Sequence, residues 1–163
     1  MKRPHVLAAA LAAACVSPAL ALQAPSAPHE SAYAWEAGLA FGWDFDSDRN
    51  LWAASIARRF GEGWKGVFEF ADGRHGSHGA YVTSLKVVKE LFRWGHAEFG
   101  VGAGGAYVSE AHHNGWGVMV AAEVAYPIAR QWAAKLEASY LIGVGELDEL
   151  RAPVVQAGIL YKF

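Results

Sequence analysis

The sequence has almost no cysteine and no hydrophobic run long enough for a transmembrane helix. Cys15 is the only cysteine among 163 residues, so a disulfide framework is excluded. The Ala-rich stretch from Val6 to Val16 is shorter than the roughly 20 apolar residues that a helix needs to cross a bilayer. With 14 basic and 16 acidic residues the net charge is −2, which gives no reason to expect a nucleic acid as a partner.

The first residues have the three parts of a secretory signal peptide. Residues 1–3 are basic, an apolar stretch follows, and residues 19–21 read Ala-Leu-Ala, the small-x-small pattern of a signal peptidase site. We predict cleavage after Ala21. The residues before Cys15 also resemble a lipoprotein signal, with alanine where leucine is usual, so lipidation of Cys15 is an alternative. Without it, the exported chain has no thiol chemistry.

Beyond the signal peptide (1–21) and a short flexible lead-in (22–30), the sequence predicts one domain at 31–163. Its first segment is the clearest. Odd positions 33–45 read Tyr, Trp, Ala, Leu, Phe, Trp, Phe, while the even positions between them read Ala, Glu, Gly, Ala, Gly, Asp. A period of two gives a strand one apolar face. Five aromatic residues opposite glycines and carboxylates are typical of a strand between lipid and a narrow polar interior.

The alternation recurs in seven further segments, roughly 51–60, 64–71, 80–89, 96–108, 116–126, 132–144 and 155–163. An even number of strands returns both termini to one side of a membrane. An open sheet edge is excluded in hydrocarbon, because each unpaired backbone group costs several kcal/mol. Eight strands enclose an interior that side chains can fill. We therefore predict an all-β, eight-stranded antiparallel up-and-down transmembrane β-barrel with a plugged lumen.

The last segment carries the most specific signal. Ile159, Tyr161 and Phe163 lie on its apolar face and end in an aromatic carboxyl terminus. This ending resembles the assembly signal of bacterial outer-membrane β-barrels, and the whole domain resembles the small OmpA-like and porin-like barrels. The resemblance implies export to the outer membrane, recognition by the barrel-assembly machinery, and contact with membrane lipid and lipopolysaccharide. It further implies a monomer without cofactor and with a structural or surface-interaction role.

Charged residues recur at the positions that should face the lumen. Paired carboxylates can perform acid–base catalysis, but charges of both signs in a narrow lumen also form salt-bridge networks, because buried charges must be paired. We favour the structural interpretation. The predicted network comprises Glu36, Glu69, Glu98, Glu123, Glu137, Lys65, Lys86, Lys135 and Lys162.

Eight-stranded outer-membrane lipid A deacylases offer an alternative function. Their signature is His-x-Ser on a late strand with a downstream Glu, which together supply a nucleophile, its base and an orienting acid. The corresponding stretch here is Glu137-Ala138-Ser139, with Glu146 and Glu149 downstream. Glutamate replaces the histidine, so Ser139 has no evident base. We keep a deacylase-like hydrolase with Ser139, Glu137 and Glu149 only as the second hypothesis.

Four histidines give a third hypothesis, a surface site for a metal or small ligand. His75 and His78 lie in one predicted outer connection, and His112 and His113 lie in the next one. Imidazole suits Zn²⁺, Cu²⁺ or Ni²⁺. Such spacing in a Gly-rich loop is unspecific, and exposed loop histidines are usually only solvated.

Overall fold

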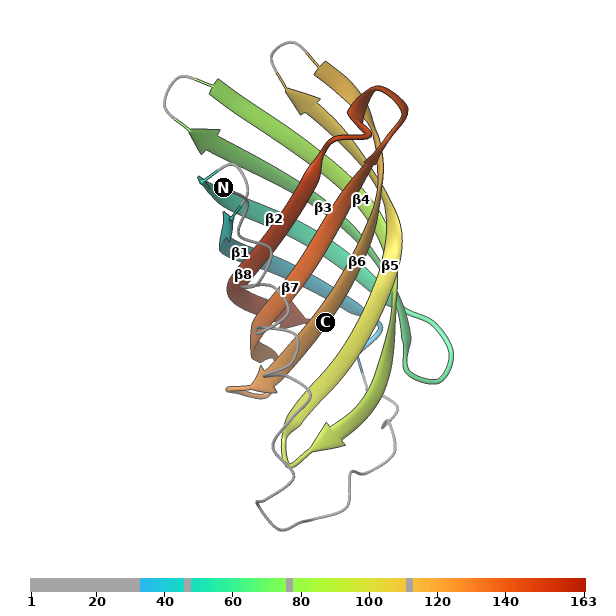
Figure 1. The fold of residues 1–163 in the computed structure, drawn as a ribbon. Helices are drawn as coiled ribbons and strands as arrows, with labels where there is room; N and C mark the ends of the chain where they lie inside the picture. Colours follow the sequence, from blue (N-terminus) through green and yellow to red (C-terminus); the bar gives the residue numbers. More distant parts are fainter. Residues whose placement is uncertain (1–32, 46–47, 76–77, 111–112) are drawn as a thin grey trace, which may run out of the picture.

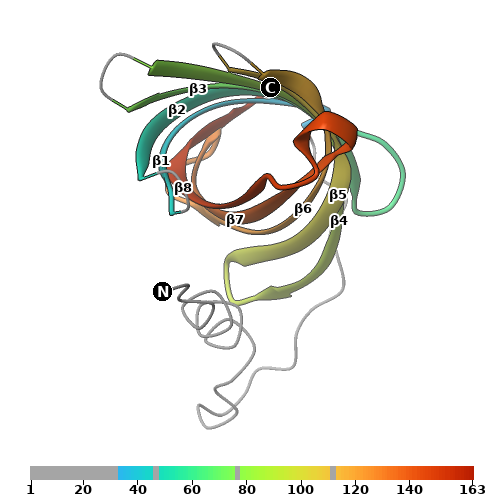
Figure 2. The ribbon, with the colours of Figure 1, turned by 45° about the horizontal axis from the view of Figure 1, so that its top comes forward.

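The computed structural model describes residues 33–45, 48–75, 78–110 and 113–163, and these form a closed barrel (Figures 1 and 2). Every strand pairs antiparallel with its neighbours in chain order, and the first pairs with the last. The predicted eight-stranded antiparallel barrel is therefore confirmed. The elements are β1 (Trp35–Asp44), β2 (Arg49–Arg59), β3 (Trp64–His75), β4 (His78–Trp94), β5 (Ala97–Glu110), β6 (His113–Pro127), β7 (Trp132–Val144), the 3-10 helix η1 (Gly145–Leu147) and β8 (Arg151–Lys162).

The seam between β1 and β8 closes the sheet. It runs in register from Glu36 opposite Lys162 to Asp44 opposite Val154. At one end, the Trp35 amide donates to the Phe163 carbonyl oxygen at 3.0 Å, and the Phe163 amide donates to the Trp35 carbonyl oxygen at 2.9 Å. We call this the terminus end of the barrel, and the end where η1 lies the loop end. Closure leaves no free edge along the seam.

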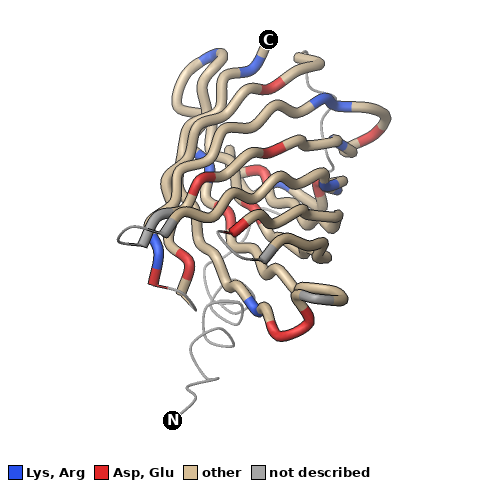
Figure 3. The backbone as a smooth tube through the Cα atoms, turned by 90° about the horizontal axis from the view of Figure 1, so that it is seen from above, with Lys and Arg blue, Asp and Glu red and all other residues tan. Residues whose placement is uncertain are grey.

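The two faces of the barrel differ sharply in chemistry. Outward Phe41 and Leu85 are 76% and 65% exposed, whereas the neighbouring inward Lys86 is 1% exposed. Along the strands, among the side chains that the structure describes, outward charged residues occur only near the ends: Arg58 and Lys89 at the terminus end, and Asp72 and Arg151 at the loop end. Figure 3 shows long stretches of strand without any charged residue. The outer wall thus carries an uncharged belt between two charged rims.

Tight curvature explains two of the inward glycines. A Cβ atom on Gly104 would overlap the carbonyl oxygen of Leu85 on β4, and one on Gly158 would overlap that of Leu39 on β1. Neighbouring strands in a narrow barrel approach on the concave side, where a side chain would force them apart. Glycine permits this approach.

Strand β4 is longer than the sequence predicts. The predicted segments 80–89 and 96–108 leave residues 90–95 as a connection, but β4 continues to Trp94, and the turn lies at Gly95 and His96. A β-bulge between Glu90 and Phe92 shifts the pairing with β5. The extra residue leaves both Leu91 and Phe92 exposed, which breaks the period of two and hides the strand from a pattern search. The β4–β5 hairpin therefore projects at the terminus end (Figure 1).

No helix in the described ranges has the length and hydropathy of a membrane span. The 3-10 helix η1 contains only three residues. Its Leu147, with Leu150, packs against an apolar cluster inside the loop end of the barrel. The only helix among the described elements thus helps to cover the lumen.

Candidate functional site

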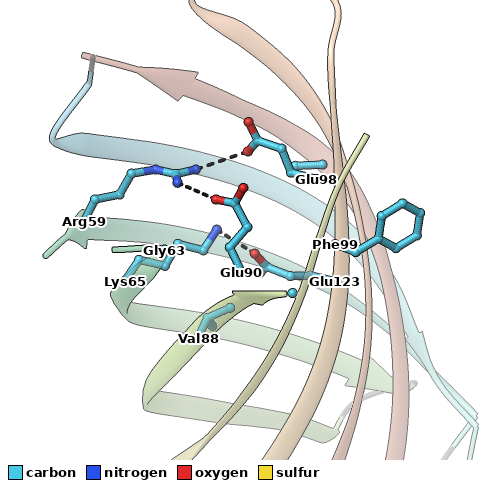
Figure 4. Close-up of a pocket in the computed structure, with 10 residues that line it drawn as sticks. Arg59, Gly63, Lys65, Val88, Glu90, Glu98, Phe99 and Glu123 are labelled. Atoms are coloured by element: carbon cyan, nitrogen blue, oxygen red, sulfur yellow. Dashed lines mark hydrogen bonds and ion pairs between the residues drawn. The ribbon is translucent and has the colours of Figure 1, made fainter. Parts of the chain in front are cut away.

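A continuous chain of ion pairs runs through the lumen, and Arg59 is its branching point at the terminus end (Figure 4). The Arg59 guanidinium from β2 lies 2.7 Å from Glu36 Oε1 on β1, 3.1 Å from Glu90 Oε2 on β4 and 3.2 Å from Glu98 Oε2 on β5. Lys162 Nζ on β8 lies 3.2 Å from Glu98 Oε2. One guanidinium thus links three strands across the barrel.

Lysines extend the network toward the middle of the lumen. Lys65 Nζ lies 3.2 Å from Glu36 Oε2 and 2.6 Å from Glu123 Oε1. Lys135 Nζ lies 3.9 Å from Glu123 Oε2 and 2.7 Å from Glu137 Oε2. Lys65 bridges carboxylates from two other strands, whereas Lys135 links Glu123 on β6 to Glu137 on its own strand, β7. Cationic and anionic side chains therefore alternate along the lumen.

The centre of the network is fully buried. Lys86 Nζ is ion-paired with Glu137 and lies 3.5 Å from Glu69 Oε2, and the side chains of Lys86 and Glu137 are both 0% exposed. The Gln156 amide nitrogen donates to Glu69 Oε1 at 3.4 Å. Ionised groups tolerate such burial only when they are paired and hydrogen-bonded. This geometry supports the structural interpretation of these charges over acid–base catalysis.

All nine residues that we predicted for the network lie inside the barrel and form ion pairs. The structure adds three that the sequence did not single out, namely Arg59, Glu90 and Arg93. Alternation does not reveal Glu90 and Arg93, because the bulged end of β4 resembles a turn in the sequence. It does not reveal Arg59 either, because Arg59 follows another arginine, Arg58, at a strand end. The connected network around Arg59 joins six carboxylates (Glu36, Glu69, Glu90, Glu98, Glu123, Glu137) to six cations (Arg59, Lys65, Lys86, Arg93, Lys135, Lys162). The formal charges of this set cancel.

The loop end of the lumen is apolar. Inward side chains from β5 to β8 form a cluster there, and η1 and the residues after it pack against this cluster. Arg49 on β2 is ion-paired with Glu110 on β5 near the same end. The apolar cluster comprises Ala106, Val108, Met119, Leu141 and Ala152, with Val82, Leu147 and Leu150 beside it.

Two cavities beside the ion pairs have volumes of about 10 Å³ each, close to the minimum for one water molecule.

The candidate hydrolase residues lie in different places, two inside the lumen and one in a connection. Ser139 and Glu137 are both buried and point into the lumen, because they are two residues apart on β7. Glu137 is held by Lys86 and Lys135, and Glu149 is exposed in the connection after η1. Ser139 therefore lies on the lumen side of the barrel wall and not on its outer surface.

The candidate metal ligands are only partly described. His75 and His78 pair at the end of the β3–β4 hairpin, and His113 pairs with Glu110 at the end of the β5–β6 hairpin. The backbone thus brings these three positions to the loop end on neighbouring hairpins. Their side chains and the whole of His112 lie outside the described part of the structure. No group of three metal-ligating side chains occurs among the residues that the structure does describe.

The candidate assembly signal forms an aromatic cluster at the terminus end. Tyr161 packs against Trp132, with ring centres 4.9 Å apart, and stacks on Phe163 at 6.0 Å. Ile159 is 45% exposed and Phe163 is 49% exposed on the same outward face. The structure places these three residues beside the seam on the outer surface.

The fold of this chain is similar to those of several solved outer-membrane β-barrels. The N-terminal β-barrel domain of Pseudomonas aeruginosa OprF matches with a TM-score of 0.66 and 16% identity, over 79% of this chain and 96% of that domain. Neisserial surface protein A (NspA) matches with a TM-score of 0.65 and 13% identity over the same shares. The outer membrane enzyme PagL matches with a TM-score of 0.52 and 11% identity, over 78% of this chain and 98% of that one.

No protein-family model and no curated protein matches the sequence. The chain nevertheless has the fold of the small eight-stranded outer-membrane β-barrels. The resemblance inferred from its alternating strands is therefore confirmed at the level of fold.

Proposed function

We propose that the protein is an integral outer-membrane β-barrel with a structural or surface-interaction role and a lumen closed to solutes. The observation that carries this proposal is the division of the wall into an uncharged outer belt and a fully paired charged interior. Such an exterior is stable in hydrocarbon, and such an interior is stable only when enclosed.

Aromatic side chains near both rims support membrane insertion. At the loop end, Trp52 packs edge-to-face on Phe70, with ring centres 5.9 Å apart, and its indole nitrogen donates to Asp72 Oδ2 at 3.1 Å. At the terminus end, the Arg58 guanidinium lies 5.4 Å from the ring centre of Trp35. Amphipathic rings are favoured at the two membrane interfaces. The long Arg58 side chain can extend from this position toward the polar interface.

The closed lumen argues against a wide pore. Ion pairs occupy its centre and terminus end, and the apolar cluster fills its loop end. In this proposal the signal peptide delivers the chain to the periplasm and the termini face that side. The connections at the loop end face outward toward lipopolysaccharide and any external partner.

Two measurements on the refolded protein test the proposal. Folded small barrels resist mild detergent, so we expect unboiled and boiled samples to migrate differently in a gel. We also expect no stable conductance steps in planar bilayers. A single gel band that is unaffected by boiling, or a large steady conductance, would contradict the insertion or the closure respectively.

A further inference from the structure

The outer wall formed by β5 to β8 contains a depression of about 290 Å³ within the uncharged belt. Its floor is one row of paired residues on adjacent strands: Val101 opposite Ala122, Ala122 opposite Ala138, and Ala138 opposite Val155. The depression reaches the backbone of inward-facing residues such as Gly102 and Ser139. Residues in a single row thus form the floor of a groove across β5, β6, β7 and β8. These are the four strands coloured from yellow to red in Figure 1.

Larger residues flank the two floor alanines, Ala122 and Ala138, on both sides. Val120 and Tyr140 line the loop side of the groove. The next outward row toward the terminus end carries Phe99, Val124 and Leu136. Because barrel strands tilt by about 35–45°, a row perpendicular to them climbs obliquely across the belt. The groove therefore has the shape of a channel for one narrow, flexible, apolar chain.

The same row continues onto β4, near the terminus end of the barrel, where it contains the cationic residue Lys89. Lys89 on β4 pairs with Val101. Its Nζ lies 5.0 Å from the ring centre of Trp64 and donates to the Glu62 carbonyl oxygen at 2.5 Å. An ammonium group has three donors, so Lys89 can also bind an anionic oxygen. Four strand spacings separate Lys89 from Val155, which is about 19 Å at the usual 4.7–4.9 Å per spacing.

We propose that this groove is a binding site for one phospholipid of the periplasmic leaflet, with its phosphate at Lys89 and one acyl chain along Val101, Ala122, Ala138 and Val155. The proposal rests on the proposed membrane insertion and adds a defined lipid site to it. A phospholipid has an anionic phosphate joined to long apolar chains. The site has the matching arrangement, with the Lys89 ammonium at one end of an apolar groove.

A second copy of the protein fits this surface poorly. A two-fold dimer joins the same patch of both copies, so one groove would face the other. The void would then have about twice the volume of a single groove, and its lining would lose contacts that only inserted atoms can restore. An acyl chain fills the groove without that cost.

Native mass spectrometry of the detergent-refolded barrel with added dipalmitoyl phosphatidylglycerol tests the proposal. We expect one retained lipid per wild-type chain and loss of the lipid-bound peak in Ala138→Phe, which blocks the floor. Lys89→Gln should retain less lipid than wild type. The matched control is Ala54→Phe, which makes the same substitution at an outward position on β2 and should keep the lipid.

Gel mobility of the same samples before and after boiling separates this inference from the proposed function. Folded samples without bound lipid would overturn the site while leaving the barrel intact. Equal lipid retention by Ala138→Phe and wild type, or a dimer peak that Ala138→Phe removes, would also overturn it. If Ala138→Phe does not fold, Ala122→Val and Ala138→Val give the same comparison with a smaller side chain.

Discussion

Replacing Lys86 with methionine removes the cation at the centre of the lumen while keeping much of its volume. Glu137 would retain Lys135, 2.7 Å away, and Glu69 would retain the amide hydrogen bond from Gln156. The connected network around Arg59 would then change from six carboxylates and six cations to six carboxylates and five cations. Because the side chains of Lys86 and Glu137 are 0% exposed, solvent cannot screen the uncompensated charge.

Removing one partner of a buried ion pair typically costs about 3–5 kcal/mol. At about 1.4 kcal/mol per factor of ten, we expect Lys86→Met to lower the folding equilibrium constant by at least about a hundredfold. The assay is urea unfolding of the refolded barrel in lipid vesicles, followed by tryptophan fluorescence.

The double variant Lys86→Met/Glu137→Gln provides the control, since replacing both partners of a buried pair is often nearly neutral. We expect it to recover much of the lost stability, which a double-mutant cycle measures as coupling. If Lys86→Met unfolds within about 1 kcal/mol of wild type, or if the double variant is no more stable than the single one, the lumen network does not stabilise the barrel as argued.

Three further predictions concern the remaining candidate sites. Phe163→Asp should slow refolding into vesicles and reduce the heat-modifiable fraction, because it places a charge beside Tyr161 on the outward face; wild-type refolding would remove the basis for an assembly role. Lipid A from cells that overexpress the protein should keep its acyl chains, and mass spectrometry showing an acyl loss that Ser139→Ala abolishes would instead establish the hydrolase. Calorimetry at neutral pH should give modest Zn²⁺ binding that disappears in His112→Ala/His113→Ala, whereas equal heats from both proteins would show that these histidines are only solvated.

The strand pattern was predictable because a thin wall between lipid and a narrow lumen imposes a strict period of two. Alternation then indicates whether each side chain faces the lumen or the outer surface. It is sufficient to place Lys86 and Glu137 in the lumen. The bulge in β4 was not predictable, because one inserted residue leaves both Leu91 and Phe92 exposed and imitates the end of a strand. For the same reason, the sequence does not indicate that Glu90 and Arg93 belong to the lumen network.

The ion pairs between side chains on opposite sides of the barrel could not be predicted from the sequence either. Arg59 lies beside Glu98, 39 positions away, because barrel curvature and stagger bring β2 and β5 together in the lumen. The groove on β5 to β8 depends likewise on register, which places Val101, Ala122, Ala138 and Val155 in one row. Alternation assigns a face to each residue but does not fix the alignment of neighbouring strands.

A cysteine scan of β7 tests the central claim most directly. Residues 133–142 are replaced singly by cysteine in a chain that starts after Cys15, and each is labelled with a fluorophore after refolding into vesicles that contain brominated lipid. The account predicts strong quenching at the outward positions 134, 136, 138, 140 and 142, and weak labelling or quenching at the inward positions between them. Uniform quenching along the strand, or equal access of every position to a water-soluble quencher, would contradict a membrane-embedded barrel with a closed lumen.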